Sequence, residues 1–134
     1  MRKNLRSESG ASAVELALLL PVLMMILFGI IEFGLALYRQ AILTNASREG
    51  ARFGIVQSTP PITNAAVDAK IDAYLAAAGI NPGTVTRNAP VLTGGIGSDV
   101  TVTLTLPYTY VVLPGLTSIT PSINLVATTV MRHE

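Results

Sequence analysis

The chain has 134 residues, of which 50% are hydrophobic and only 13% are charged, and its formal net charge is +1. This composition is more apolar than that of an ordinary soluble domain and indicates that part of the chain lies in a membrane. The weak, scattered positive charge argues against nucleic-acid binding, and the absence of cysteine excludes disulfides and thiolate metal sites. The residues beyond position 57 suffice for one small core, which argues against a large enzyme.

The amino-terminal part of the chain contains one long apolar segment. Residues 16–31 carry no charge and lie between Glu15 and Glu32. If Glu32 is tolerated, residues 16–38 exceed the length of about 20 apolar residues that a membrane-spanning helix needs. We therefore expect a single-pass membrane anchor.

A basic start followed by an apolar run fits a cleaved signal peptide, a permanent anchor, or an anchor that is cut on its amino-terminal side. The small residues GASA at 10–13 precede the apolar run instead of following it, which disfavours ordinary signal cleavage. A cut after Gly10 would leave Ala11 as the new amino terminus. Such a cut would explain why a glycine stands at position 10 and why a charged residue, Glu15, stands at the start of the apolar run.

The basic residues on the two sides of the anchor do not settle its orientation. Three of them precede it, and Arg39, Arg48 and Arg52 follow it closely, so that the positive-inside rule gives almost a tie. An amino-terminal segment of only ten residues is easily left in the cytoplasm, whereas the carboxy-terminal part resembles an exported domain. We expect the amino terminus inside and the carboxy terminus outside.

The helical pattern continues beyond the apolar segment. Residues 38–56 contain no proline, and apolar Ile42, Ala46 and Phe53 recur near helical spacing beside a polar face. The pattern predicts one helix over about residues 12–56, roughly 65 Å long at 1.5 Å per residue. Pro21 removes a backbone hydrogen bond and is expected to kink it.

The outer half of this helix has a stripe of small residues. Ala46, Gly50 and Gly54 lie four apart, so another backbone could approach closely along them. Two partners are open from the sequence: the chain's own sheet and a neighbouring copy of the protein.

The remaining residues predict a small α+β head. A second, shorter helix is expected at 62–78, and the period-two alternation at 99–112 predicts a strand with one buried face. A brief strand at 84–87 and a last strand at 123–132, antiparallel to the long one, complete a sheet of about three strands. Pro107 is expected at an edge, a bulge or the end of its strand. Helices over one face of such a sheet form a stable two-layer fold.

Residue types that carry chemistry are sparse. His133 has no second histidine or cysteine with which to share a metal, and the GGIGS run at 94–98 lacks the lysine of a phosphate loop. Asp68 and Asp72 lie one turn apart on the expected wet face of the second helix. We expect no enzyme activity, no metal and no cofactor.

Four features in a fixed order resemble a known family. After a short basic leader come Gly10 and ASAVE, an apolar run with an early proline, and NASREGARFG at 45–54. This order resembles the TadE family of pilin-like proteins of tight-adherence (Flp) pilus systems, over about residues 9–54. Leu16 follows the glutamate where the major pilins of these systems have an aromatic residue, which favours the minor type.

The resemblance implies a function in the bacterial inner membrane. It implies processing by a prepilin peptidase after Gly10, with Ala11 as the mature amino terminus and Glu15 as its fifth residue. It also implies a minor pseudopilin that contacts other pilin-like subunits and the membrane platform of pilus assembly. The chain would then divide into a leader at 1–10, a membrane helix at 11–38 and an exported head, periplasmic or extracellular, at 39–134.

The two glutamates have separate explanations. The new amine of Ala11 would lie one helical turn from Glu15 and would offset the cost of its charge near the hydrocarbon, about 2–3 kcal/mol; alternatively, Glu15 lies in the headgroup layer of a fixed anchor. Glu32 is either an interfacial carboxylate at the opposite surface or a polar contact with a partner. Arg48 and Arg52 are further candidates for partner contacts.

A second class of function stays open from the sequence. The head could belong to a permanently anchored binding module that recruits a partner outside the membrane. Loss of residues 1–10 distinguishes the two functions.

Overall fold

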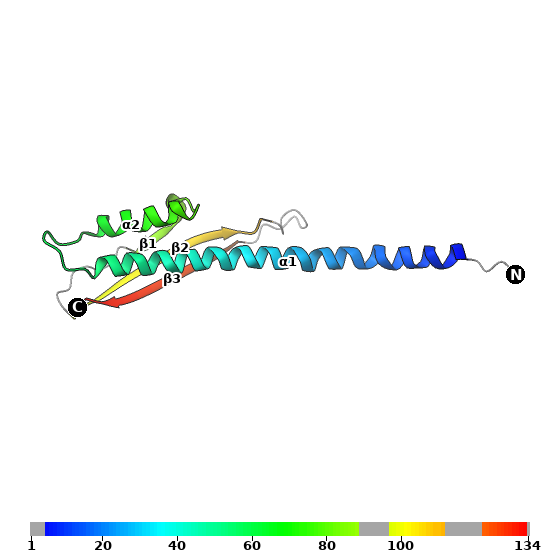
Figure 1. Ribbon diagram of the computed structural model, residues 1–134, viewed down its shortest axis with the longest axis horizontal. Helices are drawn as coiled ribbons and strands as arrows, with labels where there is room; N and C mark the ends of the chain where they lie inside the picture. The colour runs from blue at the N-terminus through cyan, green and yellow to red at the C-terminus, as the bar shows by residue number, and fades with distance from the viewer. Residues whose placement is uncertain (1–4, 89–96, 112–121, 134) are drawn as a thin grey trace.

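The protein is described by a computed structural model that covers residues 5–88, 97–111 and 122–133. Its long axis is a single helix, α1 (Leu5–Gly54), and the other elements pack along the carboxy-terminal half of that helix (Figure 1). The amino-terminal half extends alone beyond them. The shape is therefore a rod with a head on one half.

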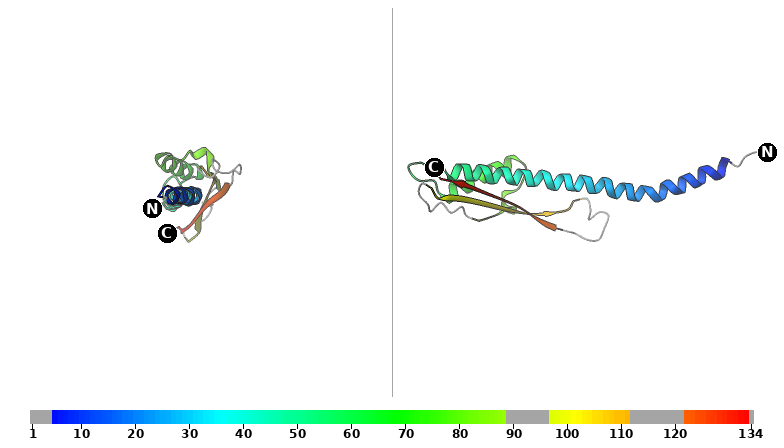
Figure 2. Two further views of the ribbon diagram at one scale, coloured as in Figure 1. Left: turned by 90° about the vertical axis from the view of Figure 1, so that its right-hand side faces the viewer. Right: turned by 90° about the horizontal axis from the view of Figure 1, so that it is seen from below.

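Helix α1 runs without interruption through Pro21, in agreement with the single long helix that the sequence predicts. Figure 2 shows that α1 changes direction within its blue, amino-terminal part, which contains this proline. A proline inside a helix removes one backbone hydrogen bond and bends the helix at that point.

Helix α2 (Asn64–Ala77) lies beside the end of α1. Thr63 caps it, because the Thr63 side chain accepts a hydrogen bond from the Ala66 backbone N–H. The helix ends before Gly79, whose φ of 77° lies in the left-handed region that favours glycine. A short 3₁₀ turn, η1 (Pro82–Thr84), leads from α2 to the sheet.

The sheet has three antiparallel strands in the order β1-β2-β3: β1 (Thr86–Asn88), β2 (Asp99–Thr109) and β3 (Ser122–Arg132). The long strands pair along their whole length, from Asp99 with Arg132 to Thr109 with Ser122. Strand β1 pairs with only three residues of β2, at positions 103–105. Pro107 lies beyond that pairing, where one side of β2 is an edge, so its missing N–H breaks no ladder with β1.

Two layers enclose the core. Seen along α1, both helices lie on one face of the sheet (Figure 2), and the buried side chains alternate with partly exposed threonines along β2. The inward side chains of β2 are Val100, Val102, Leu104, Leu106 and Tyr108. The α+β class, the short second helix and the three-stranded antiparallel sheet predicted from the sequence are confirmed.

The stripe of small residues on α1 faces the head, and at its centre it meets a helix instead of the sheet. A Cβ built on Gly50 would lie 2.6 Å from Cδ1 and 2.7 Å from Cγ1 of Ile71 in α2. Ala46 is fully buried, and Gly54 is buried as well. The sequence had offered the chain's own sheet or a second copy as partner, and the packed partner of Gly50 is the chain's own α2. Glycine permits this close approach because it has no side chain.

The acidic residues of α2 lie at the surface and pair with a basic residue of the sheet. Arg87 of β1 forms an ion pair with Asp72 and lies 4.0 Å from Asp68, and it also donates to the Pro82 carbonyl. The side chains of Asp68 and Asp72 are 34% and 41% exposed, so this face of α2 is partly solvated, and Arg87 of β1 covers the rest of it. These contacts join α2 to the edge of the sheet.

Replacement of Gly50 with alanine should destabilise the head by about 1–3 kcal/mol, because its methyl group would overlap Ile71 in a closed core. The same substitution in an Ile71→Ala background should be neutral or stabilising, since the overlapping atoms are gone and alanine favours the helix. Thermal unfolding of the full chain, followed by circular dichroism, measures both effects.

Gly34→Ala is the matched control, because no atom lies within 4 Å of a Cβ at this helical glycine. Equal effects at positions 34 and 50 would contradict the close packing of α1 on α2.

Candidate functional site

The amino-terminal half of α1 presents apolar side chains on all sides. Within the part of the chain that the structure describes, α1 is the one helix long and apolar enough to cross a membrane, and no residue of its most apolar window is buried. Residues 14–31 carry exposed leucine, isoleucine, valine and methionine side chains, several of them more than half exposed. Water does not favour such a surface, so this helix serves as a single-pass membrane anchor.

The three residues predicted for processing lie at the free end of this anchor. Gly10, Ala11 and Glu15 are all exposed, and no atom lies within 4 Å of a Cβ built on Gly10. Ala11 and Glu15 are separated by four helical residues and therefore share a face. The backbone between Gly10 and Ala11 is thus free of the head.

At the other end of the anchor, the carboxylate of Glu32 is buried in the head. Its side chain is only 2% exposed. The Tyr108 hydroxyl donates a hydrogen bond of 2.5 Å to Oε1, and the backbone N–H of Val111 donates to both carboxylate oxygens at 2.9 and 3.0 Å. A buried carboxylate needs such donors, because an unsatisfied charge in an apolar environment is very costly. The contact ties α1 to the end of β2.

Tyr108 is enclosed by charged and aromatic neighbours. The guanidinium carbon of Arg39 lies 5.2 Å from the centre of its ring, and the Tyr110 ring meets it edge-on at 5.6 Å. Burial, the hydrogen bond to Glu32 and the charge of that carboxylate together raise the pKa of Tyr108 from 10.0 to about 12. The phenol is therefore held in its neutral, donating form. We call Glu32, Arg39, Tyr108, Tyr110 and the Val111 amide the junction cluster.

The junction cluster corrects the interpretation of Glu32 as a carboxylate placed at the membrane surface by helix length alone. Its partners lie within the chain, and burial against the head begins at Glu32, ahead of the expected boundary at residue 39. A signal was present in the sequence. Glu32, Ala36 and Leu43 continue the buried face of α1 at helical spacing. The sequence does not reveal that Tyr108, far along the chain, supplies the hydrogen-bond donor.

The other predicted contact residues remain on the surface of α1. Arg48 and Arg52 are exposed, and Nη2 of Arg52 donates to both carboxylate oxygens of Glu49, at 3.1 Å to Oε1 and 3.0 Å to Oε2. Glu49 also lies 3.7 Å from Lys70 of α2. Exposed pairs of this kind add little stability. The role of Arg48 and Arg52 in partner contacts stays a prediction.

Two polar contacts fasten α1 to strand β3. The Gln40 side-chain amide donates to the Val126 carbonyl at 2.8 Å, and the hydroxyls of Ser47 and Thr129 lie 2.7 Å apart. Ser47 is fully buried and also donates to the Thr44 carbonyl. Neither contact was predicted, since serine and glutamine on a helix give no sequence signal of their cross-chain partners.

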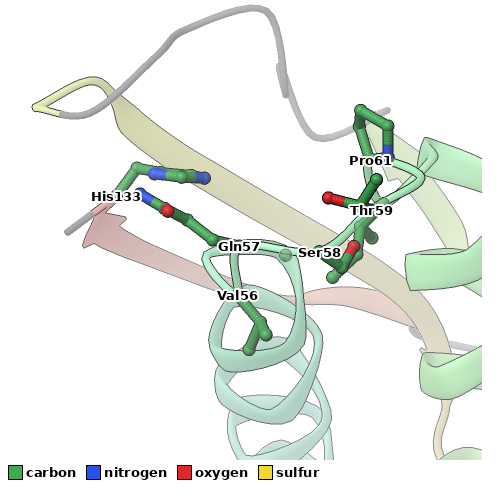
Figure 3. A pocket seen from close by; sticks show the side chains of 8 residues that line it. Val56, Gln57, Ser58, Thr59, Pro61 and His133 are labelled. Carbon is green, nitrogen blue, oxygen red and sulfur yellow. The ribbon is translucent and has the colours of Figure 1, made fainter.

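A hollow of about 500 Å³ lies at the end of the head farthest from the anchor. The segment after α1 lines it together with His133, whose ring lies beside the Gln57 side chain (Figure 3). His133 is the one ionisable side chain among the described residues that line it. Among the described residues, no group of three or more histidine and acidic side chains could hold a metal ion.

Comparison with known proteins identifies the segment that carries the anchor. Residues 10–52 match the family model of TadE-like proteins, which confirms the resemblance seen in the sequence and links the chain to tight-adherence pilus systems. No curated protein and no solved structure matches the chain. The match begins at Gly10 and ends at Arg52, so it contains the anchor, Glu32 and the REGAR motif.

The head should lose stability in alkaline solution through Tyr108. In the unfolded chain the phenol has its ordinary pKa of about 10, and in the fold the pKa is raised to about 12. The folded state holds the proton more tightly, so the stabilising contribution is complete below pH 10 and is lost as the pH rises toward 12. Urea unfolding between pH 8 and 12 measures this loss.

Tyr108→Phe should flatten the alkaline part of that profile, and Tyr38→Phe, at an exposed position on α1, is the control. An unchanged profile in Tyr108→Phe would contradict the assigned pKa.

Proposed function

We propose that this chain, TadE-like over residues 10–52, is a minor pseudopilin-like component of tight-adherence pilus assembly. A prepilin peptidase cuts it after Gly10, its amino terminus faces the cytoplasm of the inner membrane, and its head faces outward. It acts by helix packing and catalyses no reaction. The single observation that carries the proposal is that the family match starts at Gly10 and includes the whole anchor.

The position of Gly10 supports the proposed cut. The residue is exposed, and the surrounding helix contacts nothing in the head. Removal of residues 1–10 also removes three basic residues and one acidic residue, Glu8, so the formal charge falls from +1 to −1, that is, +1 minus (+3 − 1). Without the basic leader, less charge holds the amino terminus on the cytoplasmic side.

Glu15 has a role in docking under this proposal. A cut leaves an ammonium group on Ala11, four residues from the carboxylate. Pairing with that amine or with the amine of a neighbouring subunit offsets the cost of a carboxylate at the edge of the hydrocarbon. The pair would fix the depth and register of the helix among other pilin-like subunits.

The free half of α1 supplies the packing surface. It is apolar on every side, whereas the other half is already covered by α2, β2 and β3 on its buried face. Other pilin-like subunits and the membrane platform of the assembly system are the proposed partners. Arg48 and Arg52, exposed on the far part of α1, are the proposed polar contacts of the head with them.

One observation favours the alternative function, a permanently anchored binding module. The hollow beside Gln57 and His133 lies at the far end of the head, where a partner outside the membrane would reach it. A binding module of this kind needs no processing, so the state of the amino terminus separates the two functions.

Intact-mass measurement of the protein, purified from cells that make the peptidase, should show the loss of residues 1–10. Gly10→Leu should block the cut, because the bulky side chain would stand at the cleavage site. Gly29→Ala is the matched control, since this helical glycine also has no atom within 4 Å of a built Cβ. A purified protein that still carries residues 1–10 would contradict the pseudopilin proposal.

Glu15→Gln separates processing from docking in the same cells. It should leave the cut unchanged, because the carboxylate follows the cleaved bond, and should reduce the number of assembled pili. If this variant assembled pili normally, the proposed cut would stand, but the proposed pairing of Glu15 with an amine would be wrong.

A further inference from the structure

We infer that the end of the head nearest the anchor is embedded in the lipid headgroup layer, so that the sheet makes a second contact with the bilayer beside α1. The near end is defined here by Glu32, the last residues of β2 with the residues that follow it up to Val111, and the start of β3 at Ser122 and Ile123. The inference rests on α1 crossing the membrane and is independent of any role in pilus assembly.

The first argument is the length of the exposed apolar surface on α1. Phe33, Leu37 and Tyr38 are 65%, 55% and 61% exposed, although the residues that precede the first two, Glu32 and Ala36, are buried against the head. Residues 16–38 would rise roughly 35 Å at 1.5 Å per residue, and the hydrocarbon core is only about 30 Å thick. If the hydrocarbon starts just after Glu15, its outer boundary falls near residue 35, beyond the point where the head begins.

The overlap means that the lipid-facing side of α1 and the head occupy the same depth. One side of the helix carries Phe33 and Leu37 toward the surroundings, and the other side carries Glu32 into the junction cluster. A head that starts at that depth cannot lie wholly in water while the opposite helix face lies in lipid.

The second argument is the distribution of charge. Residues 100–131, which include nearly all of the two long strands, contain no acidic or basic residue. Strand β2 begins at Asp99 at the far end and ends at Thr109, two residues before Val111, whose N–H donates to Glu32. Among the described residues, the ion pairs of the head involve none of the residues of the near end; they join Glu49, Arg52, Asp68, Lys70, Asp72, Arg87, Asp99 and Arg132.

At the near end, the two charges on α1 are arranged as a bilayer surface requires. The Glu32 carboxylate is buried and receives hydrogen bonds from Tyr108 and Val111, so it is not presented to lipid. Arg39 and the exposed Tyr38 lie about one turn or two farther out, where an aromatic ring and a long cationic side chain suit the headgroup layer.

The third argument is that the near end exposes apolar side chains of its own. Val111 is 64% exposed and Ile123 is 40% exposed. They continue the apolar surface of the anchor onto the sheet, so the same lipid that covers α1 is the partner that covers them. A second copy of the chain would also suit an apolar surface, and the experiment below distinguishes it.

The chain has no cysteine, so single cysteines can carry an environment-sensitive fluorophore in the otherwise unchanged full-length protein. Val111→Cys and Ile123→Cys report on the near end in phosphatidylcholine vesicles that contain doxyl-labelled lipid. Val130→Cys is the matched control, because Val130 is 57% exposed on the same strand as Ile123 but near the far end. Ile26→Cys reports on the anchor itself.

The inference predicts that doxyl lipid quenches the labels at 111 and 123 severalfold more than the label at 130, and that iodide in the water quenches in the reverse order. Quenching at 111 and 123 equal to that at 130 would overturn it, and strong quenching at 26 in the same vesicles would show that the anchor still spans the bilayer. Dilution-dependent crosslinking of the 111 variant to a second copy, without doxyl quenching, would overturn it in favour of self-association.

Discussion

The hydrogen bonds that the Glu32 carboxylate receives from Tyr108 and from the Val111 N–H are the contact on which the shape of the molecule depends. They join the helix to the end of β2 at the point where α1 changes from a free rod to one layer of a folded head. A carboxylate in such an apolar stretch costs a great deal when unpaired. Its presence there is explained by the donors that the sheet brings to it.

Much of the fold could be predicted from the sequence because its patterns are local. The uninterrupted helical spacing around Ala46, the period-two alternation of β2 and the turn residues between elements each depend on neighbouring residues. The Gly10 and REGAR motifs likewise lie in one continuous segment, which the family match confirms. The partners of Glu32, Gly50 and Asp72 lie far away in the sequence, and no local pattern encodes which strand or helix will meet them.

The two halves of α1 have different roles: one is the membrane anchor, and the other attaches the head. The free half is apolar on all sides and carries Gly10 and Glu15, so the proposed cut and the proposed packing with other helices would not disturb the head. The bound half is held by close packing at Gly50 and by polar contacts at Ser47 and Glu32. Under the proposed function in pilus assembly, such a rigid attachment would transmit force on the anchor to the head.

A double-mutant cycle on Glu32 and Tyr108 tests this attachment most directly. Glu32→Gln, Tyr108→Phe and the double variant are compared with the unchanged protein by urea unfolding at pH 7. The account predicts a coupling free energy of about 1–3 kcal/mol, because Glu32→Gln removes the charge of the acceptor and Tyr108→Phe removes the donor of the same buried, charge-assisted hydrogen bond. Additive effects, with a coupling near zero, would contradict the claim that this contact holds the head to the helix.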